Sequence, residues 1–184
     1  TGPSCEALDY DTELSHYVDA FTQLLDDERI DASRIYLYGS SLGSTTAPLV
    51  AMRLQNTGRD IAGLMVQGGG GVSYLERKIN FDRAYLERRP DAVVPDAIHD
   101  EMLDRIRFHY EYLIEDRDPD EIARSDVAMA RVRNDVLGLD KHTHYGRPFR
   151  WHQQAAKRNF LEAWAVLDAP ALVIFNRFDQ FEAR

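Results

Sequence analysis

The chain has 184 residues, of which 44% are hydrophobic and 29% charged, which is enough apolar material for one domain with a packed core. Its 22 Lys and Arg residues stand against 31 Asp and Glu residues, so the formal net charge is −9. An acidic surface repels phosphate backbones and anionic lipid, so we expect neither a nucleic-acid nor a membrane partner. No apolar run approaches the roughly 20 residues of a membrane-spanning helix. The single cysteine, Cys5, excludes an internal disulfide and a cysteine-rich zinc module.

The first part of the chain shows the pattern of a helix, a strand and a second helix. Between residues 12 and 25 apolar residues recur three and four positions apart, which predicts an amphipathic helix. A short β-rich run at 34–38 ends at Gly39 and predicts a strand. The stretch from 39 to 55 then resumes a helical pattern.

Two more apolar runs, at 61–67 and 171–175, are nearly continuous and are bounded by turn residues. Such runs are typical of strands buried on both faces of a parallel sheet. The region from 72 to 165 is charge-rich and helical in period, with no convincing strand. One apolar helix face in this region is formed by Leu103, Ile106, Tyr110 and Leu113. The order of strand, helix, strand, long helical insertion and strand predicts an α/β fold with parallel strands.

The strongest local motif is Gly39-Ser40-Ser41-Leu42-Gly43, a G-x-S-x-G between a predicted strand and a predicted helix. A nucleophilic serine needs a tight, strained strand-to-helix turn, and the glycines on either side allow close approach without Cβ clashes. Ser41 is the centre of the pattern and therefore the candidate nucleophile. The backbone N–H of Leu42, at the helix start, would point to the oxyanion of a tetrahedral intermediate.

The segment RIYLYGSSLGSTTAPLVA (34–51) resembles the nucleophile elbow of the α/β-hydrolase family, of the serine-aminopeptidase or acyl-esterase kind. The segment APALVIFNRFDQF (169–181) is similar to the late strand of that family, which ends in a turn bearing the catalytic acid. The resemblance covers residues 1–67 and 160–184. It implies a partial hydrolase core, formed by 1–71 and 166–184, and a helical cap inserted at 72–165.

The resemblance assigns the nucleophile to Ser41, one oxyanion-hole amide to Leu42 and the triad acid to Asp179. The family order is serine, acid, histidine, and no histidine follows Asp179 in this sequence. We therefore expect the histidine to lie outside this sequence, and the chain by itself to be inactive, because Ser41 then lacks a base. The start at Thr1, without methionine, likewise predicts a piece of a longer enzyme.

The implied reaction is hydrolysis of an ester or amide bond in a small-molecule or peptide substrate, with no cofactor. Fold does not choose between ester and peptide, and the sequence leaves the oligomeric state open. A lone cysteine and the absence of a signal-like start favour the cytoplasm.

Two other functions are compatible with the sequence. One is a non-catalytic α/β binding or interaction module, in which the turn at Ser41 only connects strand and helix. The other is a metal-dependent hydrolase that uses His142 and His144, with Asp140 and His152 nearby. Because no HExxH motif or cysteine pair accompanies these residues, we expect no metal site. Each histidine of the chain is otherwise expected to be a surface or interhelix hydrogen-bonding residue.

The aromatic, polar stretch from 149 to 154 stands just before the chain returns to the predicted sheet. In a capped hydrolase this position would overlook the nucleophile, so Trp151 and His152 are candidates for the substrate pocket. The alternative is ordinary packing of the aromatic side chains beneath the cap.

Overall fold

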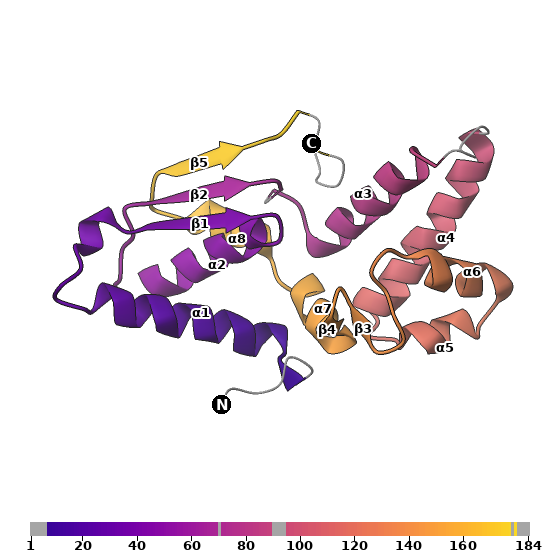
Figure 1. Ribbon diagram of the computed structural model, residues 1–184, viewed down its shortest axis with the longest axis horizontal. Coiled ribbons are helices and arrows are strands. Elements are labelled where there is room, and N and C mark those ends of the chain that lie inside the picture. Colours follow the sequence, from indigo (N-terminus) through magenta and orange to yellow (C-terminus); the bar gives the residue numbers. More distant parts are fainter. Residues whose placement is uncertain (1–6, 70, 90–94, 178, 180–184) are drawn as a thin grey trace. The chain divides into compact units, whose positions relative to one another are not determined.

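A computed structural model of the chain describes residues 7–69, 71–89, 95–177 and 179 (Figure 1). Cys5 lies outside the described residues. The chain divides into two compact units, a sheet unit formed by residues 11–73 and 159–184 and a helical unit formed by residues 1–10 and 74–158. The sequence predicted these boundaries at 71/72 and 165/166. Mixed α/β architecture with a parallel sheet is confirmed.

The sheet unit holds a three-stranded parallel sheet of order β1-β2-β5. Its elements are α1 (Tyr10–Leu25, whose first residue belongs to the helical unit), η2 (Ala32–Arg34), β1 (Tyr36–Ser40), α2 (Gly43–Gln55), β2 (Gly63–Gln67), α8 (Phe160–Val166) and β5 (Ala171–Ile174). Ser40 pairs with Gln67, and Gln67 pairs with Ile174. The carboxyl ends of all three strands therefore lie at one edge of the sheet, as the arrowheads in Figure 1 show.

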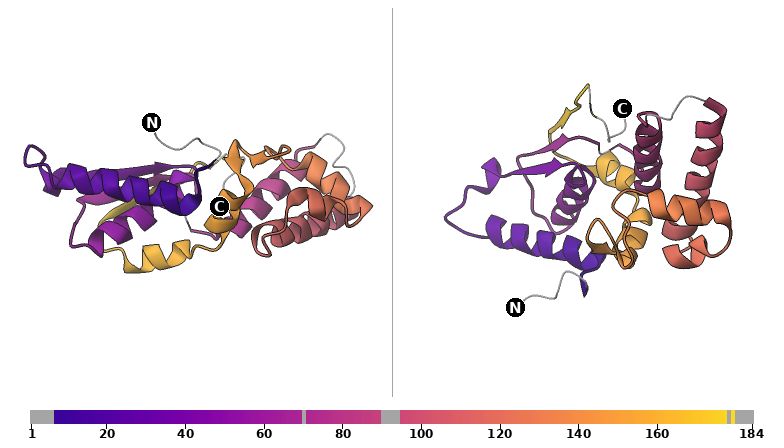
Figure 2. Two further views of the ribbon diagram at one scale, coloured as in Figure 1. Left: turned by 90° about the horizontal axis from the view of Figure 1, so that it is seen from below. Right: turned by 45° about the vertical axis from the view of Figure 1, so that its right-hand side comes forward.

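One face of the sheet is covered by helix α2, which packs against β1 and β2, and α8 packs in turn against α2 (Figure 2). Leu37, Leu64 and Val66 are buried there. Tyr36 and Tyr38 of β1 alternate to the opposite face and are exposed. This alternation is the period of two that a half-buried strand requires.

The expectation that the last strand is buried on both faces is wrong, because every residue of β5 is exposed. The strand pairs on one side with β2, which is the only element of the described residues with which it makes extensive contact. The continuous apolar run predicted the strand correctly. It did not predict whether the strand is buried, because burial depends on which other elements pack against the strand.

The helical unit consists mainly of α3 to α7, with a small hairpin inserted. Its elements are α3 (Tyr74–Leu86), α4 (Pro95–Leu113), α5 (Pro119–Ala123), α6 (Val127–Asp135), β3 (Thr143–His144), β4 (Arg147–Pro148) and α7 (Phe149–Ala156). Asp118 and Asp126 cap α5 and α6, because each carboxylate accepts hydrogen bonds from backbone N–H groups of the first turn. No helix of the described residues is long and apolar enough to cross a membrane.

The expectation of a region without strands between 72 and 165 is also wrong, because β3 and β4 form an antiparallel hairpin. The two residues between these strands, Tyr145 and Gly146, have φ values of 50° and 72°. Two consecutive positive φ values are typical of the tight turn that joins hairpin strands. Strands of two residues are too short to leave a periodic signal in the sequence.

Most of the apolar helix face on α4 is exposed. Leu103 and Tyr110 are 52% and 48% exposed, and Ile106 is also exposed, whereas Leu113 is buried. The buried side of the helix carries Arg105, Phe108, His109 and Tyr112. This orientation is possible because carboxylates of the helical unit neutralise the buried Arg105.

Candidate functional site

The turn between β1 and α2 holds Ser41 in an unusual backbone conformation. Ser41 has a φ of 52°, in the left-handed region that residues other than glycine rarely adopt. Its N–H donates to the carbonyl oxygen of Gln67 at 2.9 Å, which extends the pairing of β1 with β2 by one residue. The Ser41 side chain is exposed. The sheet thus supports a strained turn that presents the serine to solvent at the carboxyl edge.

The two glycines of the motif differ in their steric roles. A Cβ on Gly39 would lie 2.1 Å from the Gly43 carbonyl oxygen and 3.0 Å from the Ala47 Cβ, so only glycine fits. A Cβ on Gly43 would meet no atom within 4 Å among the described residues outside its neighbours and its own helix backbone. The steric reason given for both glycines therefore holds for Gly39 and is wrong for Gly43.

The start of α2 carries an uncapped N-terminus beside Ser41. Leu42 occupies the N-cap position, where its side chain makes no capping hydrogen bond, and within the described residues its N–H has no acceptor. The next two side chains turn inward and are fully buried. Ser44 Oγ donates to the Ser41 carbonyl oxygen at 2.6 Å, and Thr45 Oγ1 donates to the Leu42 carbonyl oxygen at 2.7 Å. The N–H of Leu42 thus lies at the positive end of the helix dipole.

Asp179 lies in the turn that follows β5. Its N–H donates to the Asn176 carbonyl oxygen at 3.0 Å, and its side chain is half-buried. Because Ser40 and Ile174 are both paired with Gln67 of the intervening strand, the elbow and this turn leave the same edge of the sheet about 10 Å apart. The assignment of Asp179 as the triad acid stays a prediction.

Histidines are distributed unevenly between the two units. His16, on α1, is the only histidine in the sequence of the sheet unit, and its side chain is exposed. On the hairpin, His142 is exposed whereas His144 is buried. Among the described residues no three His, Cys, Asp or Glu side chains gather where they could hold a metal ion.

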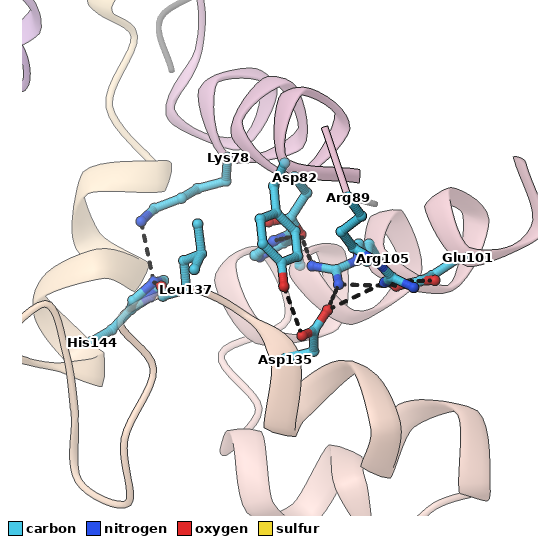
Figure 3. A network of polar contacts seen from close by, with 10 residues as sticks. Lys78, Asp82, Arg89, Glu101, Arg105, Asp135, Leu137 and His144 are labelled. Atoms are coloured by element: carbon cyan, nitrogen blue, oxygen red, sulfur yellow. Dashed lines mark hydrogen bonds and ion pairs between the residues drawn. The ribbon is translucent and has the colours of Figure 1, made fainter. Parts of the chain in front are cut away.

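An ionic network within the helical unit was not predicted from the sequence (Figure 3). Arg105 is fully buried and makes ion pairs with Asp82 at 3.3 Å, with Glu101 at 3.0 Å and with Asp135. His109 Nε2 lies 2.9 Å from Asp82 Oδ2. Burial by itself raises the pKa of Asp82, but His109 and Arg105 outweigh burial and the net pKa is lowered. Except for Arg105 and Glu101, which are four residues apart, these partners are 23 to 30 residues apart, so only Glu101 gives a local sequence signal.

A second buried cluster joins α3, the hairpin and α7. The rings of His144 and His152 stack with their centroids 4.5 Å apart. His152 Nε2 donates to the His144 carbonyl oxygen at 2.7 Å, so its Nδ1 accepts from the Tyr74 hydroxyl at 2.6 Å. Lys78 Nζ lies 3.3 Å from His144 Nε2. Burial, followed by the charge of Lys78, lowers the pKa of His152 to about 3.

Trp151 and His152 lie inside the helical unit. Trp151 is buried and contacts Tyr10 and Tyr74 through edge-to-face ring packing, and Arg147 lies over its ring. The contacts described for both side chains are therefore packing contacts of that unit. Their assignment to a substrate pocket stays a prediction.

The chain matches no family model, no curated protein and no solved structure. The class of protein that the fold defines is an α/β protein with a short parallel sheet and a strained strand-to-helix turn at its carboxyl edge.

Proposed function

We propose that this chain carries the nucleophile elbow of an α/β-hydrolase-type serine hydrolase, which cleaves an ester or amide bond through Ser41. The observation that carries the proposal is the left-handed conformation of Ser41 at the exposed strand-to-helix turn. If the turn only connected strand and helix, glycine could adopt this conformation without strain. A residue with a Cβ in the left-handed region destabilises the fold by roughly 1–2 kcal/mol. A nucleophile is a reason to keep a side chain at this position.

In the proposed reaction Ser41 Oγ bonds to the carbonyl carbon while a base takes its proton. The N–H of Leu42, with the dipole of α2, stabilises the negative oxygen of the tetrahedral intermediate. The base returns the proton to the leaving group, and a water molecule then hydrolyses the acyl-enzyme by the same steps. Asp179 would orient the imidazole, and the family order places that histidine after Asp179, where residues 180–184 hold none.

The test is covalent labelling with a fluorophosphonate, followed by intact mass, with and without added imidazole. Free imidazole can act as a general base toward Ser41, so we expect it to accelerate formation of a single adduct on the wild-type chain. Ser41→Ala should abolish the adduct, and the matched control Ser40→Ala should keep it. An adduct that survives in Ser41→Ala, or no imidazole-dependent adduct in the wild type, would refute the assignment.

The exposed apolar residues of the sheet unit favour a second candidate, a non-catalytic interaction module. Four consecutive apolar side chains in and directly after β5 are exposed: Leu172, Val173, Ile174 and Phe175. On β1, Tyr36 is exposed as well. Contiguous exposed apolar side chains are typical of protein interaction surfaces. An inert Ser41, together with tight association of this surface with another chain, would favour the module over the enzyme.

A further inference from the structure

The hydroxyl of Ser44 is placed to control the peptide group between Ser41 and Leu42. Ser44 is fully buried three residues after Ser41. Its backbone N–H donates to the Ser41 carbonyl oxygen at 2.9 Å, and its Oγ lies 2.6 Å from the same oxygen. Two donors from one residue therefore hold this carbonyl at the start of α2.

The carbonyl of Ser41 and the N–H of Leu42 belong to one peptide group. This group is planar and trans, so its C=O and N–H bonds point in opposite directions. Because Ser44 draws the Ser41 oxygen into the first turn of α2, the Leu42 N–H must point out of the helix. A rotation of this plane would turn the N–H inward and present a carbonyl oxygen, which repels an oxyanion, in its place.

The backbone alone gives this plane weak support. The bond from Ser44 N–H spans only three residues, and such bonds at a helix end are less well aligned than those of the helix interior. The side chain at the N-cap position, Leu42, makes no capping hydrogen bond with any described residue. Ser44 Oγ also lies 3.2 Å from the carbonyl oxygen of Gly68, at the exit of β2. Because a hydroxyl has a single proton, the shorter contact, to the Ser41 carbonyl oxygen, is the principal hydrogen bond.

We propose that Ser44 is a positioning residue that directs the Leu42 N–H toward the oxyanion in the reaction of Ser41. The inference rests on the proposed serine-hydrolase function. Ser44 touches neither substrate nor Ser41 Oγ in this role; it acts through the orientation of one peptide plane.

Thr45 offers a matched control. Like Ser44 it is fully buried, and its hydroxyl donates to the carbonyl oxygen of Leu42, in the next peptide group. That oxygen also accepts hydrogen bonds from the N–H groups of Thr45 and Thr46, so it stays anchored when the hydroxyl is removed. Thr45→Val therefore removes a buried hydroxyl without freeing the peptide plane that carries the Leu42 N–H.

The experiment measures acylation of Ser41 in the imidazole-supported reaction, with an aryl ester and with its thionoester. Sulfur is a weak hydrogen-bond acceptor, so an oxyanion-hole donor stabilises the tetrahedral intermediate of the thionoester only slightly. We expect Ser44→Ala to lower the maximal acylation rate with the ester by about 10- to 100-fold, at an unchanged half-saturating concentration. The thionoester rate should stay within about twofold, since the donor contributes little to it.

The controls separate this inference from the proposed function. Ser44→Thr retains the hydroxyl and should restore the ester rate, and Thr45→Val should leave the ratio of ester to thionoester rates unchanged. If Ser44→Ala does not fold, Ser44→Cys, with a weaker donor of similar size, should lower that ratio. An equal loss with both substrates, or an unchanged ratio in the Ser44 variants, overturns the positioning role while the reaction of Ser41 stands. Acylation that persists in Ser41→Ala overturns the proposed function itself.

Discussion

Acidification should destabilise the helical unit through the stacked pair His144 and His152. Both side chains are almost fully buried. Burial, followed by the charge of Lys78, lowers the pKa of each ring, that of His144 well below 6.5 and that of His152 to about 3. Arg147 also lowers the pKa of His152, and the neighbouring His152 and His109 also lower the pKa of His144. The folded unit therefore holds both rings neutral when the unfolded chain takes up protons.

The sign and size of the effect follow from linkage. A histidine whose folded pKa is depressed contributes full stability above its unfolded pKa of 6.5, and this contribution falls as the pH drops toward the folded pKa. Each pH unit in this window removes about 1.4 kcal/mol per histidine, so lowering the pH from 6.5 to 5 removes about 2 kcal/mol for His152. The pKa of His144 is shifted in the same direction, so its uptake of a proton on unfolding adds to this loss.

The assay is chemical unfolding at pH 7, 6 and 5, followed by the fluorescence of Trp151 in a Trp164→Phe background. His152→Gln keeps a donor for the His144 carbonyl and an acceptor for the Tyr74 hydroxyl but cannot titrate. We expect it to lose about 2 kcal/mol less unfolding free energy than the wild type between pH 7 and 5.

The control for this prediction is His142→Gln, on the same hairpin but exposed, which should follow the wild type. If the wild type and His152→Gln lose stability in parallel as the pH falls, the buried pair does not carry the acid response and the reasoning fails.

Further substitutions test the elbow and the ionic network, each by chemical denaturation. Gly39→Ala should cost about 3 kcal/mol because its Cβ overlaps the Gly43 carbonyl, whereas Gly43→Ala, in open space, should change the unfolding free energy by less than about 1 kcal/mol. Ser41→Gly should relieve the backbone strain at this turn and raise the unfolding free energy by up to about 1 kcal/mol. The same variant should lose fluorophosphonate labelling. A lower unfolding free energy would contradict the strained turn. Arg105→Met should cost about 3–5 kcal/mol, because it leaves Asp82 buried without its guanidinium partner; near-neutrality would contradict the role of the network.

The local elements around the candidate site were accessible from the sequence. The strand before Gly39 and the helix after it follow from short-range patterns, and the structure has β1 and α2 there. The G-x-S-x-G spacing selected Ser41, whose strained φ is a separate observation of the structure. The sequence pattern around Ser44 does not predict that its hydroxyl donates to the Ser41 carbonyl oxygen.

The orientation of α4 shows that an apolar pattern alone does not identify the buried face of a helix. Leu103, Ile106 and Tyr110 have helical spacing, and apolar spacing normally marks the inward side. The buried side instead contains Arg105, which is compatible with the interior only because Asp82 and Asp135, 23 and 30 residues away in sequence, neutralise it. The helical periodicity of apolar residues shows which side chains share one face of a helix. It does not show which elements pack against that face.

By itself the sequence determined the order of strands and helices around the parallel sheet, the position of the strand-to-helix turn and the parallel pairing that long crossovers allow. These properties depend on backbone preferences and on neighbours within a few residues. Tertiary structure decided the exposure of β5, the inward face of α4 and the two buried polar clusters of the helical unit. The physical reason is that a charge or an imidazole is buried only where groups from distant parts of the chain pair with it, and a local sequence pattern does not show which distant groups these are.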